Sequence, residues 1–235
     1  MTHPILAVKN LAIEHRNFSL RGKSTFLLKE INFSLTANTS ISIIGESGTG
    51  KTTLMNSLLG LHNYNRGEIL FYGKEIRKLA SHEKKKYHRS VQPVFQNYRY
   101  SFNSMVSLEK SLLIGFNRQM TRRQKREQLT EYLNLTGLEP GIIHKYPHQL
   151  SGGELQRLAL VRALVSDPEI LILDEPFSSL DIINEKKLLD VLLTIRTACG
   201  LSFIFITHKR PLVKYFNDRV YGIEANQFFR WKQYE

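Results

Sequence analysis

One eight-residue stretch constrains this chain more than any other, Gly45-Glu46-Ser47-Gly48-Thr49-Gly50-Lys51-Thr52. It follows an apolar run at 41–44 and leads into Thr53-Leu54-Met55, so we expect a strand, a glycine-rich loop and a helix. The glycines permit positive φ and bring successive N–H groups around an anion, and the new helix points its positive end at the same place. Lys51 adds a charge for the terminal phosphates, and the Thr52 hydroxyl can reach a magnesium ion. The stretch therefore predicts a phosphate-binding loop.

The composition indicates a globular chain without disulfides. Its 235 residues are 42% hydrophobic, enough for a sizeable core, and the single cysteine, Cys199, excludes an internal disulfide. The start, Met1-Thr2-His3-Pro4, lacks the charged and apolar regions of a secretory signal peptide. No apolar stretch approaches the ~20 residues of a transmembrane helix. We therefore expect a cytosolic protein whose membrane role, if it has one, goes through a partner.

The net charge of +12 lies entirely in the first half of the chain. Residues 1–126 hold 21 Lys and Arg against 7 Asp and Glu, whereas residues 127–235 hold 12 against 14. The densest basic runs, 84–89 and 122–126, fall in predicted helices. A solvated helix face is the default interpretation of such runs, with nucleic acid or anionic lipid as the alternatives.

The order of apolar patterns predicts strands that alternate with helices. Strands are expected at 5–8, 27–35, 41–44, 67–73, 91–95, 169–173 and 201–206, and helices after 51, near 79–89, at 108–115, at 122–135 with Thr121 as N-cap, from 151 to 165, and after 178–181. The first two strands form an antiparallel pair before the loop, and a stripe of Leu54, Leu58, Leu59 and Leu61 marks the helix after it. The later alternation is typical of a mostly parallel sheet.

Polar residues stand where several of these strands end. Asp174 and Glu175 follow the strand at 169–173, at the edge where open α/β sheets bind their ligands, and Gln96 and His208 follow two others. Two adjacent carboxylates there are costly unless a metal or a water needs them. Taken singly, each residue has an ordinary alternative: a solvated strand end, a strand cap or a histidine at the edge of the core.

Together these motifs resemble, from end to end, the nucleotide-binding subunit of ATP-binding cassette (ABC) transporters. The correspondence covers Walker A at 45–52, the Q-loop at Gln96, the signature at 150–157, Walker B at 170–176, the D-loop at 178–181 and the H-loop at His208. The resemblance implies an α/β P-loop NTPase fold with a mostly parallel sheet, an N-terminal antiparallel β part and a helical insert. The chain is expected to be one ABC ATPase domain, 1–235, with its core at 1–96 and 157–235 and the helical signature subdomain at 97–156.

The same resemblance implies ATP and Mg²⁺ as ligands. The loop residues expected to hold ATP are Gly45, Glu46, Ser47, Gly48, Thr49, Gly50, Lys51, Thr52 and Thr53. Thr52, Gln96 and Asp174 are expected to organise Mg²⁺, with Glu175 as general base and His208 as sensor of the γ-phosphate. Ser151, Gly152, Gly153 and Asp181 are expected to cover the ATP held by a second subunit. Spacing leaves His15 and Phe18 open as the residue that stacks on adenine.

The expected partners follow from the resemblance as well. A second ABC ATPase subunit, identical or homologous, completes a head-to-tail dimer, and integral membrane permease subunits contact the aromatic insert at 98–116. An extracytoplasmic solute-binding protein takes part indirectly, and nucleic acid is not an expected partner. The subunit is expected to lie peripherally on the cytoplasmic face of the membrane.

Within the family, 96–103 and the Tyr146-Pro147-His148-Gln149 segment look like the ATP-binding subunits of peptide and nickel importers. Two prolines of that pattern are replaced, by Tyr98 and Ser104, and the chain reaches Glu235 without the usual C-terminal tail. The cargo therefore stays open between nickel, or another chelated metal, and peptides, with nickel favoured because its shorter subunits often end early.

Two other classes of function are alternatives. A non-transport cassette ATPase acting on nucleic acid or ribosomes fits the basic first half, but such proteins generally hold two cassettes and this chain has one copy of each motif. An assembly subunit of a phosphonate-degrading complex belongs to the same subgroup. Intact Glu175 and His208 argue against an inactive scaffold.

Overall fold

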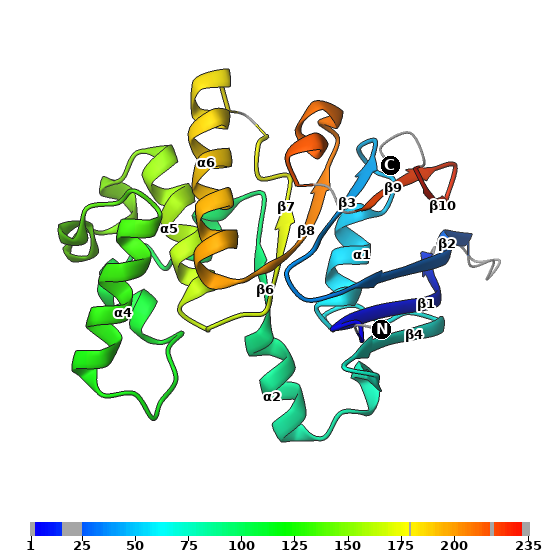
Figure 1. Cartoon of the computed structure of the whole chain (residues 1–235), viewed down its shortest axis with the longest axis horizontal. Coiled ribbons are helices and arrows are strands. Elements are labelled where there is room, and N and C mark those ends of the chain that lie inside the picture. Colours follow the sequence, from blue (N-terminus) through cyan, green and yellow to red (C-terminus); the bar gives the residue numbers. More distant parts are fainter. Residues whose placement is uncertain (1–2, 16–24, 179, 217–218, 232–235) are drawn as a thin grey trace. The chain divides into compact units, whose positions relative to one another are not determined.

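The computed structural model describes residues 3–15, 25–178, 180–216 and 219–231. They form two compact units, the first from residues 1–88 and 202–235 and the second from residues 89–201 (Figure 1). The second unit contains the expected helical insert at 97–156 together with the strands and the helix that flank it. The subdivision at 96 and 157 stays a prediction.

The first unit begins with an antiparallel sheet. Strand β1 (Leu6–His15) pairs antiparallel with β2 (Thr25–Leu35) and with β4 (Arg66–Phe71), which continues to β5 (Lys74–Glu75). Leu6 and Ile13 of β1 are both fully buried although they are seven residues apart, and the register of β1 with β2 shifts between Val8 and Leu11 and again between Leu11 and Ile13. The expected antiparallel pair is confirmed, and its connection at 16–24 lies outside the described residues.

Parallel strands form the other part of the first unit. Strand β3 (Ser40–Gly45) pairs in parallel with β8 (Ser202–Thr207) and β9 (Arg219–Glu224), and β10 (Gln227–Arg230) returns antiparallel to β9. Strands β3 and β8 are buried along their length, which explains why they read as continuous apolar runs. Because the three parallel strands run the same way, their carboxyl ends meet at one edge, where α/β sheets bind ligands.

The β9–β10 hairpin is an element that sequence reasoning did not predict. Its two-residue turn is Ala225-Asn226, and both residues have positive φ, 47° and 63°. This combination is typical of a type I′ hairpin turn, whose twist matches that of the strands it joins. Asn226, which lies between two runs of aromatic and apolar residues, is the sequence feature that could have predicted this turn.

Two helices complete the described core of the first unit. Helix α1 (Lys51–Leu58) buries Leu54 and Leu58, but Leu61 lies beyond its end and is 68% exposed, so including Leu61 in the apolar stripe was wrong. The chain leaves the helix at Gly60, which has φ +71°. Helix α2 (Ser81–Ser90) is anchored by buried Tyr87, whose hydroxyl donates to the Leu58 carbonyl and whose pKa is raised by burial.

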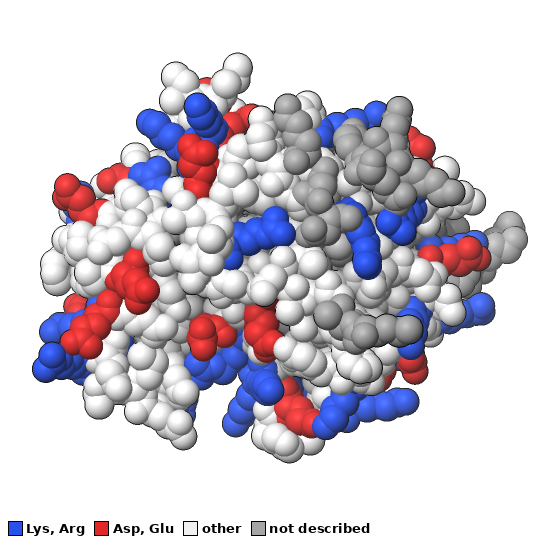
Figure 2. All heavy atoms as spheres, in the orientation of Figure 1, with Lys and Arg blue, Asp and Glu red and all other residues white. Residues whose placement is uncertain are grey.

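The basic side of α2 is open to solvent. The side chains of Lys84, Lys85 and Lys86 are all exposed. Lysine and arginine side chains project from the surface at the bottom of the view, where Figure 1 places α2 (Figure 2). This exposure agrees with the expectation of a solvated helix face.

In its described residues, 89–178 and 180–201, the second unit combines two parallel strands with four α-helices that lie wholly within it. Strand β6 (Val91–Val94) pairs in parallel with β7 (Ile170–Asp174). The helices are α3 (Leu108–Leu113), α4 (Arg122–Leu135), α5 (Gly152–Leu164) and α6 (Ile182–Cys199), with short 3₁₀ turns at Tyr98–Ser101, Pro140–His144 and Pro147–Gln149. Thr121 caps α4 with a complete capping box, as predicted. Among the helices in the described part of the chain, none is long and apolar enough to cross a membrane.

Candidate functional site

The phosphate-binding loop has the predicted local structure. Strand β3 ends at Gly45, the loop residues Glu46 to Gly48 are exposed, and α1 begins at Lys51. Gly48 and Gly50 have φ of +84° and +95°, a conformation that side-chain-bearing residues rarely adopt. The Thr49 hydroxyl donates to the Glu46 carbonyl at 2.9 Å and braces the turn. The first N–H groups of α1 have no acceptor within a helix and face this loop, so the loop can bind an anion.

Lys51 is folded back onto the loop. The residue is buried, with 7% of its surface exposed, and its Nζ donates to the carbonyl oxygens of Gly45 and Glu46, both at 2.8 Å. The ammonium group is thereby held beside the glycine-rich turn instead of ranging through solvent. Thr52 is exposed on the first turn of α1 and Thr53 is half-buried. This arrangement can place one cation and one hydroxyl against a phosphate.

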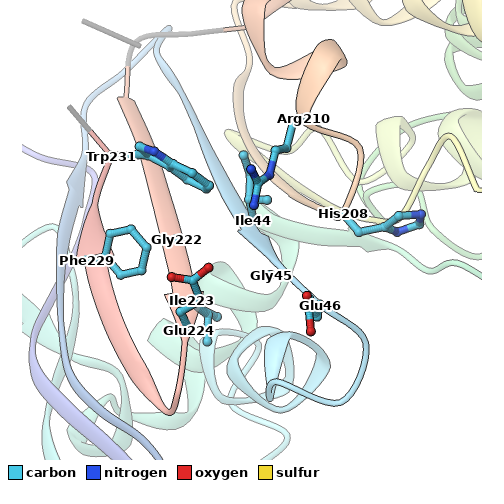
Figure 3. Close-up of a pocket in the computed structure, with 10 residues that line it drawn as sticks. All are labelled: Ile44, Gly45, Glu46, His208, Arg210, Gly222, Ile223, Glu224, Phe229 and Trp231. Atoms are coloured by element: carbon cyan, nitrogen blue, oxygen red, sulfur yellow. The ribbon is translucent and has the colours of Figure 1, made fainter. Parts of the chain in front are cut away.

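His208 lies at the same sheet edge as the loop. It follows β8 directly, and the parallel register pairs Ile44 of β3 with Thr207 of β8. Gly45, Glu46 and His208 line one pocket, with the His208 ring at its rim and directed away from the other labelled side chains (Figure 3). His208 therefore lies near the phosphate loop, and its role as sensor of the γ-phosphate stays a prediction.

The carboxylates of the second unit lie at the carboxyl end of β7. Asp174 is 5% exposed and Glu175 is 8% exposed. Glu175 has φ +48°, and such a conformation costs a non-glycine residue about 1–3 kcal/mol. The register pairs Val94 with Leu173, so Gln96, two residues beyond β6, lies at the same edge as Asp174. Amide and carboxylate oxygens are ligands that Mg²⁺ accepts.

The predicted signature residues form the start of α5. Ser151 is the N-cap: its hydroxyl accepts from the Glu154 N–H at 3.3 Å and donates to Glu154 Oε2 at 2.7 Å. The Ser151 N–H donates to the same oxygen at 2.8 Å, and these hydrogen bonds lower the pKa of the Glu154 carboxyl. Gly152 and Gly153 form the first turn, where a Cβ at Gly152 would come within 3.2 Å of the Tyr98 hydroxyl. Because Gly152 and Gly153 carry no side chains, a ligand can come close to the backbone N–H groups at the start of α5.

Sequence reasoning missed the role of Gln156. This side chain is 7% exposed, and its Nε2 donates to the Pro176 carbonyl at 2.6 Å. The bond ties α5 to the segment directly after Glu175, within one unit. A polar residue among the apolar positions of a buried helix was the signal that could have revealed it.

The remaining predicted site residues are Asp181, the magnesium ligands and the two candidates for the adenine contact. Asp181 caps α6 and accepts from the Asn184 N–H at 2.9 Å; hydrogen bonds from Asn184 lower its pKa. Thr52 belongs to the first unit and Gln96 and Asp174 to the second, so the predicted magnesium set stays a prediction. The two candidates for the adenine contact cannot be compared, because Phe18 and the side chain of His15 lie outside the part of the chain that the structure describes.

Comparison with known proteins defines the class. The family model described as ABC transporter matches residues 28–178. The chain therefore belongs to the ABC transporter family and carries its ATP-binding domain. It is 34% identical to the oligopeptide transport ATP-binding protein OppF of Haemophilus influenzae over 82% of its own length, and spans 59% of that relative. It is 32% identical to the protein of the same name from Streptococcus pyogenes serotype M1, with 94% of this chain and 72% of that one covered.

Solved structures confirm the fold. CbiO1 from Clostridium perfringens, part of the ABC transporter complex CbiONQ, matches with a TM-score of 0.83 at 29% identity, over 97% of this chain and 87% of that chain. The ATP-binding cassette MJ0796, in a dimeric state bound to ADP and Pi, matches with a TM-score of 0.81 at 24% identity, over 96% of this chain and 98% of that one. The predicted α/β P-loop ATPase fold is confirmed.

Proposed function

We propose that this chain is the ATP-binding subunit of an ABC importer and hydrolyses ATP to drive transport through separate membrane subunits. The observation that carries the proposal is the phosphate loop with Lys51 held in place and His208 at the same sheet edge. The names of the two reported relatives support an ATP-binding role in the transport of oligopeptides, and a further relative from Brucella ovis is named as a putative peptide import ATP-binding protein.

The proposed reaction is attack of water on the γ-phosphorus of ATP. Glu175 takes a proton from that water, the bond to the β,γ-bridging oxygen breaks, and ADP and phosphate leave. Lys51 and the loop N–H groups hold the β- and γ-phosphates, and His208 donates to the γ-phosphate. Thr52, Gln96 and Asp174 would hold Mg²⁺, which neutralises phosphate charge when bound.

A dimer completes the proposed site. Ser151, Gly152, Gly153 and Asp181 act on the ATP bound by a second subunit, and the N-terminus of α5 at Gly152 and Gly153 is the part that can bind an anion. The dimeric structure of the cassette MJ0796, which is 25% identical to this chain, supports the pairing of two subunits, and the head-to-tail orientation is part of the proposal. The proposed partners are permease subunits that contact 98–116, with the subunit at the cytoplasmic membrane face and a solute-binding protein acting indirectly.

The proposed cargo is peptide, because both reported relatives are named for oligopeptide transport. Nickel or another chelated metal is the second candidate, because the departures from the importer pattern at Tyr98 and Ser104 leave the cargo open. In either case we assign cargo recognition to the partner subunits. His144 and His148 are four residues apart, but Pro147 between them disfavours the helical pair that could bind a metal.

The cargo proposal is tested by reconstitution and by metal titration. Co-purified permease subunits in proteoliposomes should take up a labelled oligopeptide only with the native chain and ATP, and the tag-free chain alone should not bind nickel tightly by calorimetry. Sub-micromolar, stoichiometric nickel binding would contradict the assignment of cargo recognition to the partners. Nickel uptake without peptide uptake would show that the cargo is nickel and not peptide.

The basic face of α2 provides a test against a nucleic-acid function. Replacing Lys84, Lys85 and Lys86 together by glutamine should leave ATP hydrolysis within about twofold, because these exposed lysines lie on a solvated face. Phosphate release and RNA and DNA binding are measured for both proteins at two salt concentrations. A large, salt-dependent loss of nucleic-acid binding in the variant would revive the alternative function.

A further inference from the structure

A concave pocket of about 310 Å³ opens in the first unit between the phosphate loop and the C-terminal hairpin (Figure 3). All of its lining residues belong to that unit: Ile44, Gly45, Glu46, His208, Arg210, Gly222, Ile223, Glu224, Phe229 and Trp231. This volume lies at the lower end of the range for small-molecule sites. The pocket therefore suits a ligand of the size of an amino acid.

One wall of the pocket is apolar and aromatic. Trp231 packs against the buried cluster of Ile44, Val213 and Val220, and its ring centroid lies 5.8 Å from that of Phe229. Gly222 permits this wall, because a Cβ there would approach the Phe229 ring within 2.4 Å. Phe229 on β10 and Trp231 directly after that strand provide two aromatic faces against which an apolar side chain can pack.

Two opposite charges face the same pocket from different elements. Arg210, after β8, stacks its guanidinium carbon 4.7 Å from the Trp231 ring centroid, and Glu224 ends β9 (Figure 3). Within the described residues, neither side chain makes a hydrogen bond or an ion pair. Stacking leaves the N–H edge of the guanidinium able to donate.

We propose that this pocket binds a small zwitterion with an apolar side chain, such as a free aliphatic amino acid. Its carboxylate pairs with Arg210, its ammonium group pairs with Glu224, and its side chain packs against Trp231 and Phe229. Arg210 and Glu224 are both exposed, so the selectivity comes from the number of ion pairs: a ligand with only one charge pairs with one of them, whereas a zwitterion pairs with both. The two charges and the aromatic wall together thus define the class of ligand.

The test uses the single tryptophan of the chain as its reporter. L-Leucine is added to the full chain without nucleotide, and Trp231 fluorescence is followed, with calorimetry as an independent readout. We expect saturable binding with a dissociation constant of about 1 mM or tighter. 4-Methylpentanoate, which lacks the ammonium group, and 3-methylbutylamine, which lacks the carboxylate, should each bind about tenfold more weakly or worse.

Charge-removing variants localise the binding. Arg210→Gln and Glu224→Gln should each weaken L-leucine binding about tenfold by calorimetry, which avoids the altered baseline of Trp231 beside the changed Arg210. Arg118→Gln and Glu68→Gln remove the same charges from exposed positions outside the pocket lining and should bind like the native chain. Circular dichroism verifies that all four variants are folded.

The proposal fails if L-leucine shows no saturable binding up to roughly ten times the expected constant. It also fails if either single-charge analogue binds as well as L-leucine, or if both pocket variants retain native affinity. Because no nucleotide is present, these results are independent of the proposed ATP hydrolysis.

Discussion

Glu175→Gln is expected to bind MgATP like the native chain while losing hydrolysis by about 10²-fold or more. Glutamine keeps the size and hydrogen bonding of the side chain but cannot accept the proton of the attacking water. The phosphate contacts of Lys51 and the loop do not involve Glu175, so ground-state binding survives. Phosphate release and nucleotide affinity are measured on the same preparation.

The same variant should accumulate as an ATP-dependent dimer. Unhydrolysed ATP would stay between the phosphate loop of one subunit and Ser151 to Gly153 of the other, so the pair would not separate. Light scattering after size-exclusion chromatography, with and without MgATP, detects the dimer with itself or with a sister ATPase. Adding Ser151→Arg should disperse a homodimer by placing a bulky side chain in the shared interface.

Two results would contradict these assignments. Native hydrolysis in Glu175→Gln would remove Glu175 as the base. If Glu175→Gln loses turnover but forms no dimer in the presence of the partner subunits, the model of an ATP site shared between two subunits is contradicted, whereas the assignment of Glu175 as the base stands. Glu169→Gln, a half-buried carboxylate just before the same strand, is the matched control and should hydrolyse ATP normally.

Lys51→Ala is expected to weaken MgATP binding by roughly 100-fold or more, because a charged hydrogen-bonding partner of the phosphates is lost. The change also removes both bonds from Nζ to the Gly45 and Glu46 carbonyls, so the loop is less firmly held. Equilibrium binding of a fluorescent ATP analogue measures the effect.

The control for this prediction is Lys84→Ala, which removes an exposed lysine from α2 and should bind nucleotide normally. Circular dichroism separates a lost contact from lost folding. Affinity within a few-fold of native in folded Lys51→Ala would exclude Lys51 as the phosphate ligand.

Sequence reasoning worked best where the determining interactions are local. The helix at 122–135 has the predicted bounds, and its start is fixed locally by the Thr121 capping box. The loop at 45–52 has its predicted form because Gly48 and Gly50 permit the positive φ that it needs. Spacing also placed His208 beside the loop, since parallel strands end together.

Misses arose where distant contacts decide. Leu61 is the exception, because its cause is local: α1 ends at Leu58, and Gly60 with positive φ turns the chain away before Leu61. The hydrogen bond from Gln156 to Pro176 spans 20 residues and follows from packing that no local pattern specifies. The pocket around Trp231 depends on a hairpin that went unpredicted and on the close approach of Phe229 to Gly222.

The capping box at Ser151 has a consequence for selectivity among small anions. One carboxylate oxygen of Glu154 accepts both the amide and the hydroxyl hydrogen of Ser151, so a resident negative group already screens these two donors. An incoming phosphate must replace that oxygen as the acceptor of the Ser151 hydrogen bonds. Inorganic phosphate brings no second subunit whose contacts would compensate for the lost bonds. A lone subunit therefore does not present a bare positive helix end to the free phosphate of the cell.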